Sequence, residues 1–528
     1  MRKEKFFRLL KILPLLFCLL TVDSALAQQK RKARPLGSGG GGNSAALRQQ
    51  LSQALQLAKN SEFESAASAL FLLSRRPELQ GERAQIKYVL GLMLMEMKLN
   101  QVAAFQFVDV IRLKDERYTR LAIEKLSLVA DTLGDDTLLN YSISKVDINT
   151  FPANNRDMLY FRLGEAKSKA GDFKGAIESF ARVPLGSSYF NQALFAKGLA
   201  ELEANDPDTA SRTFRALVSA RARAPVTDTN KVAGQLAYAR ALYQKQDWDA
   251  AIEAYANIPR DHVLWHDALF EQSWAMMRGA RFRSALSNFQ SLHSTYYEDF
   301  YIPESLLLRS IVYLYICKYD EMNKVLTQFE KVYGPVSGKV NEFIKTQNDP
   351  QAYFAEVEKG AKVKRTGEKE NSNLRLPYIV MRFILGKGDV KRSLAYLKRV
   401  NDEKSRVDKN GDLRSTTVGQ YALKVLNNRI KNTRVAIGDM SKAHLLNMRV
   451  ELRDLYEQAG LIRYEMINGQ KESIRKKISE KNLPENQIDD KVDRRFYVNN
   501  GYEYYPFRGE YWLDEIGNFH YLGRQSCE

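Results

Sequence analysis

Residues 161–180 read FRLGEAKSKAGDFKGAIESF, and this stretch contains the pattern that decides the fold. A small residue, Gly164, is followed twelve positions later by Ala176 and after four more by Phe180. Between them, Gly171 and Asp172 supply the chemistry of a tight turn and of a helix cap. Two small residues let two helices approach closely, and the aromatic ring fills the space beside them. The stretch therefore predicts an antiparallel helix pair.

The same frame of small residue, alanine and aromatic recurs along the chain. Clear copies are Gly91-Ala103-Phe107, Gly198-Ala210-Phe214, Ala239-Ala251-Tyr255 and Ser273-Ala285-Phe289. Degenerate copies begin at Ala54, Ser127 and Ser310. Most starts are 34 to 37 residues apart. A fixed period of this size indicates an array of helical repeats.

These copies resemble the tetratricopeptide repeat (TPR) family over about residues 45–336. The tryptophan that the family favours early in its first helix is absent from most units, and the unit at 127 is a poor match. The resemblance implies an all-α solenoid of about eight helix pairs, coiled into a superhelix with a concave face. In the family, side chains of the first helices line that face. Carried across unit by unit, they are Arg240, Tyr243, Trp274, Met277 and Arg278.

Aromatic, methionine and arginine side chains are typical of productive protein contacts. The groove is therefore expected to bind a segment of another protein. For Trp274 and Met277 the alternative is a place in the core, where large apolar side chains usually lie.

The N-terminus predicts export. Basic residues, a short apolar run at 13–20 and the small-residue site Ala25-Leu26-Ala27 form the order of a signal peptide at 1–27. The apolar run is well short of the ~20 residues that cross a bilayer. Residues 28–44, basic and then glycine-rich, are predicted to be a flexible linker. Periplasm is the expected location, with envelope association or extracellular release as alternatives.

The charge is +17 and is concentrated late in the chain, since residues 351–495 hold 32 Lys/Arg against 20 Asp/Glu. In an exported protein this favours other envelope proteins, and as alternatives peptidoglycan or anionic lipid, over nucleic acid. A solvated helical surface is the simpler explanation.

Three regions follow the repeats. Residues 337–413 are predicted to be an irregular helical extension with a charged loop and a helix pair over 376–400. Within 414–487, seven residues step alternately by three and four, which predicts a heptad seam: Leu445, Met448, Leu452, Leu455, Ala459, Ile462 and Met466. We expect an antiparallel hairpin turning at 438–441 with Ser441 as cap, and an intermolecular coiled coil is the alternative. Residues 488–528 are aromatic and predict a small β hairpin around Gly517-Asn518, docked on the helices or binding a partner. This tail is similar to the ends of exported repeat proteins of gliding-type envelope machinery.

No catalytic or cofactor motif is present, so we expect neither an enzyme nor a cofactor. His262 and His266 have the spacing of metal ligands but lack a clear third ligand, and no metal is expected. Only Cys317 and Cys527 follow the predicted leader, and their spacing leaves a disulfide between them open. The sequence thus predicts a periplasmic scaffold or adaptor of a cell-envelope complex. A wall- or lipid-binding module and a self-assembling coiled coil are the alternatives.

Overall fold

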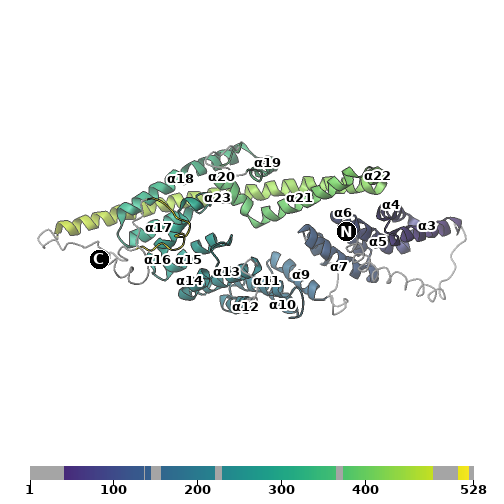
Figure 1. The fold of residues 1–528 in the computed structure, drawn as a ribbon, viewed down its shortest axis with the longest axis horizontal. Coiled ribbons are helices and arrows are strands. Elements are labelled where there is room, and N and C mark those ends of the chain that lie inside the picture. Colours follow the sequence, from purple (N-terminus) through teal and green to yellow (C-terminus); the bar gives the residue numbers. More distant parts are fainter. Residues whose placement is uncertain are drawn as a thin grey trace. The chain divides into compact units, whose positions relative to one another are not determined.

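The computed structural model describes residues 41–135, 137–143, 156–220, 229–363, 373–479 and 509–521, and the regular elements in these ranges are helices (Figure 1). The predicted signal peptide and most of the predicted linker lie outside them. Helix α3 begins at Gly41, so the end of the predicted linker is helical. The chain divides into two compact units, Met1–Val146 with Ala395–Lys431 and Asp147–Leu394 with Asn432–Glu528.

Each of the eight predicted frames falls on one pair of helices. The first four pairs are α3 (Gly41–Lys59) with α4 (Phe63–Leu73), α5 (Arg83–Glu96) with α6 (Asn100–Arg112), α7 (Glu116–Leu133) with α8 (Thr137–Ile143), and α9 (Arg156–Lys169) with α10 (Phe173–Ala181). The next four are α11 (Phe190–Glu203) with α12 (Pro207–Ala220), α13 (Thr229–Gln244) with α14 (Trp248–Ala256), α15 (Trp265–Arg278) with α16 (Phe282–Leu292), and α17 (Pro303–Tyr315) with α18 (Tyr319–Thr346). The predicted all-α, TPR-like architecture is confirmed.

A left-handed residue turns the chain seven positions after every frame start. These residues are Ser61, Lys98, Gly134, Gly171, Asn205, Gln246, Ala280 and Cys317, with φ between 56° and 80°. The next residue then precedes or caps the second helix, as where the Asp172 side chain accepts a hydrogen bond from the Gly175 amide. The degenerate units at 54, 127 and 310 therefore have the same turn as the clear ones.

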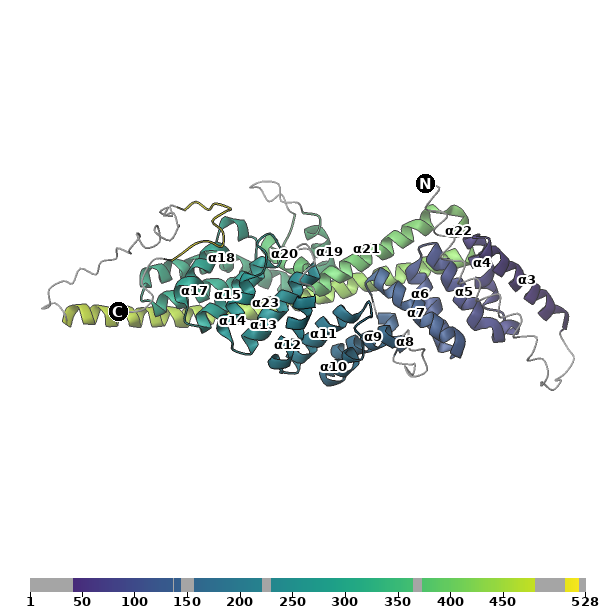
Figure 2. The same ribbon diagram turned by 60° about the horizontal axis from the view of Figure 1, so that its bottom comes forward.

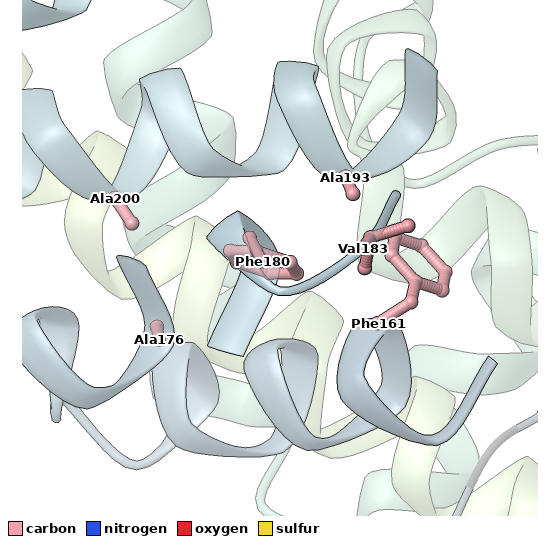
Figure 3. Close-up of a cluster of buried hydrophobic side chains, with 6 residues drawn as sticks. All are labelled: Phe161, Ala176, Phe180, Val183, Ala193 and Ala200. Carbon is pink, nitrogen blue, oxygen red and sulfur yellow. The ribbon is translucent and has the colours of Figure 1, made fainter. Parts of the chain in front are cut away.

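The frame residues form the core of each pair and of its junction with the next. Phe180 and Ala176 of α10 lie between Phe161 of α9 and Ala193 and Ala200 of α11, as Figure 3 shows. The equivalent Ala210 and Phe214 pack against Ala237 and Ala241 of α13. One helix pair thus buries its apolar face only by contact with the next pair, which is how solenoids gain stability.

The prediction of a hairpin over 414–487 is wrong. Helix α23 (Thr417–Ser479) is continuous, and Gly438 and Ser441 lie within it. The Ser441 hydroxyl donates to the Ile437 carbonyl one turn earlier instead of capping a new helix. Gly438 serves close packing, because a Cβ there would collide with the carbonyl oxygen of Pro350, at the start of α19 (Pro350–Gly360).

The predicted heptad seam is buried, and its partner is α18. The seven seam residues are at most 9% exposed. Tyr456, beside the seam, packs on Phe329 of α18 with ring centroids 4.9 Å apart, and Arg463 pairs with Glu330 at 3.0 Å. Helix α18 crosses the predicted repeat boundary at 336, with Pro335 inside it, and is therefore long enough to cover the seam (Figure 2).

The helix pair predicted over 376–400 is present as α20 (Tyr378–Gly386) and α21 (Gly388–Lys409), and α22 (Gly411–Ser415) follows. In the first unit, α21 binds the ends of repeat helices. Arg399 donates to the Leu133 carbonyl at the end of α7, and Glu403 accepts from the Gln101 amide at the start of α6. Part of the basic surplus of the C-terminal third therefore has structural partners inside the protein.

The described part of the aromatic tail, residues 509–521, contains a turn and no strand. The other residues of the predicted hairpin lie outside the described ranges. The predicted docking is present: the amides of Gly517 and Tyr521 donate to the hydroxyls of Ser291 and Ser287 on α16. Arg260 donates to the Asn518 side chain at 2.7 Å.

Candidate protein-binding face on the first helices

The predicted binding residues occupy fixed positions in the repeat. Arg240 and Trp274 each follow the buried small frame residue of their helix, and Tyr243 and Met277 come three residues later. Residues spaced by three and four share one face of a helix. The frame residue itself points into the pair and is fully buried in both helices. The pattern therefore leaves a second, outward face on each first helix.

Leu199 of α11 occupies the position equivalent to Arg240 and Trp274, and it is 41% exposed. An exposed leucine at this position extends the same face to the preceding repeat. We call these six residues the first-helix face: Leu199, Arg240, Tyr243, Trp274, Met277 and Arg278. The three helices that carry it lie in succession along the second unit (Figure 1).

Arg240 is exposed and joins two repeats. Its guanidinium donates two hydrogen bonds to Glu271 of α15, at 2.8 Å from Nε and 2.6 Å from Nη2. The Tyr255 hydroxyl of α14 donates to the same carboxylate at 3.0 Å. The hydrogen bond to Glu271 raises the pKa of Arg240, and burial raises the pKa of Tyr255. Two hydrogen bonds in a planar fork fix the orientation of the arginine.

Tyr243 and Trp274 are half-buried, so each combines a packing role with an accessible edge. Tyr243 packs edge-on against Trp248 of α14, with ring centroids 5.2 Å apart. The Arg278 guanidinium lies 5.9 Å from the centre of the Trp274 ring, within cation–π range. Met277, between them in the sequence, is also half-buried. Trp274 and Met277 are therefore neither core residues nor fully exposed surface residues.

Glu304, at the start of α17, marks where the face meets other elements. Burial raises the pKa of the Glu304 carboxyl, and its hydrogen bond with Trp274 acts in the opposite direction. Close by in the sequence, Tyr301 donates to Glu451 of α23 at 3.4 Å and its ring packs 4.8 Å from that of Phe383 of α20. Helices α20 and α23 therefore occupy this end of the repeat array, and α11, α13 and α15 present the first-helix face.

Glu271 is a functional residue that the repeat pattern did not predict. It lies three residues before Trp274, hence one turn earlier on the same helix face, and this spacing was a usable signal. Its partner Arg240 is 31 residues away in the sequence, and only the stacking of neighbouring repeats brings the two together.

His262 and His266, which have the spacing of metal ligands, contact neighbouring protein groups. His266 is 3% exposed, its ring stacks on Phe300 at 4.0 Å, and burial lowers its pKa. The His262 ring accepts from the Leu264 amide. Among the described residues, no three His, Cys, Asp or Glu side chains gather as metal ligands.

The first unit contains a pocket of about 480 Å³. Its wall includes Glu62, Phe63, Met97, Arg406 and Asn410. In the described part of the chain, no helix is both long and apolar enough to span a membrane.

The chain is similar to several repeat proteins whose structures have been solved. No family model matches the chain, and no curated protein matches it. TPR-like repeats of a putative kinesin light chain from Podospora anserina match with 14% identity, over 41% of this chain and 95% of that one, at a TM-score of 0.20.

A tetratricopeptide repeat protein from Parabacteroides merdae matches with 10% identity over 55% of this chain and 94% of that one, at a TM-score of 0.24. The apo form of RapI matches with 10% identity over 73% of this chain and 99% of that one, at 0.32. The TPR-like fold assigned here is established by the eight helix pairs and their common turn.

Proposed function

We propose that this TPR-like repeat protein is an exported, non-catalytic scaffold of a bacterial cell-envelope complex, and that its first-helix face binds an extended segment of a partner protein. The observation that carries the proposal is the equivalence of Leu199, Arg240 and Trp274. One position per repeat, on the first helices of three successive repeats, presents an exposed or half-buried side chain of a type that is common in protein interfaces.

The chemistry of the face describes the partner segment. Leu199 and the accessible part of Trp274 favour apolar side chains, because burying apolar surface is the main gain in association. Arg278 is exposed, and it favours a carboxylate that reaches the edge of Trp274. Arg240 already pairs with Glu271, so we expect it to hold α13 and α15 in register and to contribute little net charge.

Preorganisation supports binding at this place. The Arg240–Glu271–Tyr255 hydrogen bonds link three helices before any partner arrives. A face that is already fixed loses less conformational entropy when a ligand binds. The bound segment is therefore expected to order on the protein, while the repeats keep their positions.

Photocrosslinking in cells tests this binding role. A photoreactive amino acid replaces Trp274, and a matched variant carries it at Glu253, an exposed position on the second helix α14. We expect a crosslinked envelope protein from position 274 that is absent or at least tenfold weaker from position 253. Adding Leu199→Asp and Arg278→Glu should abolish the crosslink, because both changes reverse the chemistry of the face. Equal crosslinking from both positions would refute the proposal.

Export is tested separately. We expect the mature protein to begin at Gln28 and to be released with periplasmic markers on osmotic shock. Cys317 is disulfide-bonded, which supports an oxidising compartment. An intact N-terminus and co-fractionation with cytoplasmic markers would exclude the envelope role and leave the binding face to be explained in another compartment.

A further inference from the structure

The outward side of α23 carries a second apolar stripe, distinct from the buried seam. Leu461, Tyr464, Ile467 and Ile474 are 67%, 61%, 43% and 56% exposed. Successive residues turn by about 100° around a helix. Leu461 and Ile467 therefore lie about 60° to either side of Tyr464, whereas the seam residues that contact α18 lie on the opposite side. Clustered exposure of this kind marks an interaction surface.

The stripe has a symmetric pattern centred on Tyr464. Leu461 and Ile467 stand three residues before and after it, and Glu457 and Lys471 stand seven before and after. Seven residues are close to two helical turns, so both charged side chains return to the line of Tyr464. Leu461, Tyr464 and Ile467 are therefore palindromic, and the charges seven residues to either side are opposite in sign. Ile474 lies outside this symmetric centre, because the residue matched to it is Asp454.

We propose that α23 pairs antiparallel with α23 of a second copy of this chain through this stripe. In a symmetric dimer, if residue i of one copy contacts residue j of the other, then residue j of the first copy contacts residue i of the second. A twofold axis at Tyr464 places Leu461 against Ile467 of the other copy and Glu457 against Lys471, twice. A parallel pair would place Glu457 on Glu457 and Lys471 on Lys471, and like charges at such flanking positions select against that orientation.

This surface differs from the predicted intermolecular coiled coil. That alternative used the seam of Leu445 to Met466, which α18 covers within the same chain. The exposed stripe leaves the contact with α18 intact, so pairing needs no rearrangement of the second unit. It is independent of the proposed partner-binding face, whose residues lie on α11, α13 and α15.

The first test is a charge swap in the full-length mature chain, read by sedimentation velocity. We expect a dimer in the micromolar range, since the contact is short and its area is below that of a typical stable interface. Glu457→Lys and Lys471→Glu should each weaken dimerisation about tenfold or more, because each opposes like charges. The double variant should restore wild-type affinity within about threefold, because it exchanges the two signs.

The second test fixes the orientation with single cysteines. Tyr464→Cys lies on the proposed axis and should form a disulfide-linked dimer under mild oxidation. Val450→Cys, equally on the helix surface and 43% exposed, is the matched control. Fourteen residues place it about 21 Å from the axis, so two copies stand about 42 Å apart when antiparallel and should not crosslink.

Either experiment can overturn the pairing. A wild-type chain that stays monomeric at about 100 µM, far above a micromolar dissociation constant, excludes it. If Val450→Cys crosslinks as efficiently as Tyr464→Cys, the two helices pair in parallel and the antiparallel proposal is wrong. If the double charge swap does not restore the dimer, Glu457 and Lys471 do not contact each other across the interface. Circular dichroism of every variant verifies that the helices remain folded.

Discussion

The ring of Phe214 lies so close to Gly198 that a Cβ on the glycine would come within 2.6 Å of the ring atom Cζ. Phe107 has the same relationship to Gly91, again at 2.6 Å. The frame therefore encodes a contact between a missing side chain on the first helix and an aromatic ring on the second. Where the first residue is alanine or serine, as at 239 and 273, the pair accommodates a Cβ.

Gly198→Ala should destabilise the protein by about 1–3 kcal/mol, because the added methyl overpacks a site whose ring is fully buried. The gain in helix propensity, up to about 1 kcal/mol, is smaller. Gly186→Ala, where no atom lies within 4 Å, is the matched control for thermal unfolding. Gly198→Ala with Phe214→Leu should recover part of the loss, and equal stability of the two single variants would contradict the contact.

Two glycines of α23 should respond in opposite ways to the same substitution. Gly438→Ala should destabilise the second unit, because its Cβ meets the backbone of Pro350, while Gly460→Ala meets nothing within 4 Å. Gly460→Ala should therefore stabilise by up to about 1 kcal/mol through helix propensity. Hydrogen exchange over 350–360 should rise only for Gly438→Ala. Unchanged exchange there would mean that α19 does not pack on Gly438.

The turns offer a stabilising change. Ala280 has φ of 56° at the position where two other repeats have glycine. The left-handed conformation costs an alanine about 1–2 kcal/mol. Glycine avoids this cost but loses more conformational entropy on folding, which offsets part of the gain. Ala280→Gly should thus raise stability by about 0.5–1 kcal/mol, measured by chemical denaturation. Ala275→Gly, inside α15, is the control and should lower it.

Glu403 makes the stability of the first unit depend on pH. Burial raises the pKa of this carboxyl to about 8, although it accepts hydrogen bonds from the start of α6. The pKa in the unfolded chain is near 4.3, so the contribution of this group is full below that value and is lost as pH rises to about 8. The loss is at most about 1.4 kcal/mol per pH unit.

Glu403→Gln tests that dependence, because glutamine resembles the protonated carboxyl at every pH. The melting temperature of Glu403→Gln minus that of wild type should increase from pH 5.5 to pH 9. Glu358→Gln provides the comparison, at a glutamate of the second unit whose side chain is 47% exposed. A difference that stays constant over this range would show that Glu403 ionises normally.

Cys317 is disulfide-bonded, and Cys527 is the other cysteine after the predicted leader, outside the described residues. We predict that the two pair. The mature protein, denatured without reductant, should then contain no free thiol, and Cys527→Ser should contain one per chain. Peptide mapping without reduction should give a linked 317–527 fragment. A free thiol in the wild-type monomer would exclude this bond.

Local pattern determined the repeats of this protein. Gly164, Ala176 and Phe180 meet within one helix pair, and the chain supplies the next pair a few residues later, so each buried face is covered by its sequence neighbour. The degenerate unit at Ser127 follows the same rule, as the left-handed Gly134 seven residues later shows. The positions of Arg240 and Trp274 on the first helices follow from this register.

Tertiary structure decided what the pattern leaves open. The alternation of Leu445 to Met466 shows that one face of α23 is buried, but α18 as its cover depends on residues more than a hundred positions away. Gly438 is of a residue type common in turns, yet it lies within a helix. Its missing side chain leaves room for the Pro350 backbone, which packs against it. Glu271 meets Arg240 of the first-helix face only when α13 and α15 stack. Periodicity specifies which side of a helix avoids water, whereas the identity of the covering element depends on the path of the whole chain.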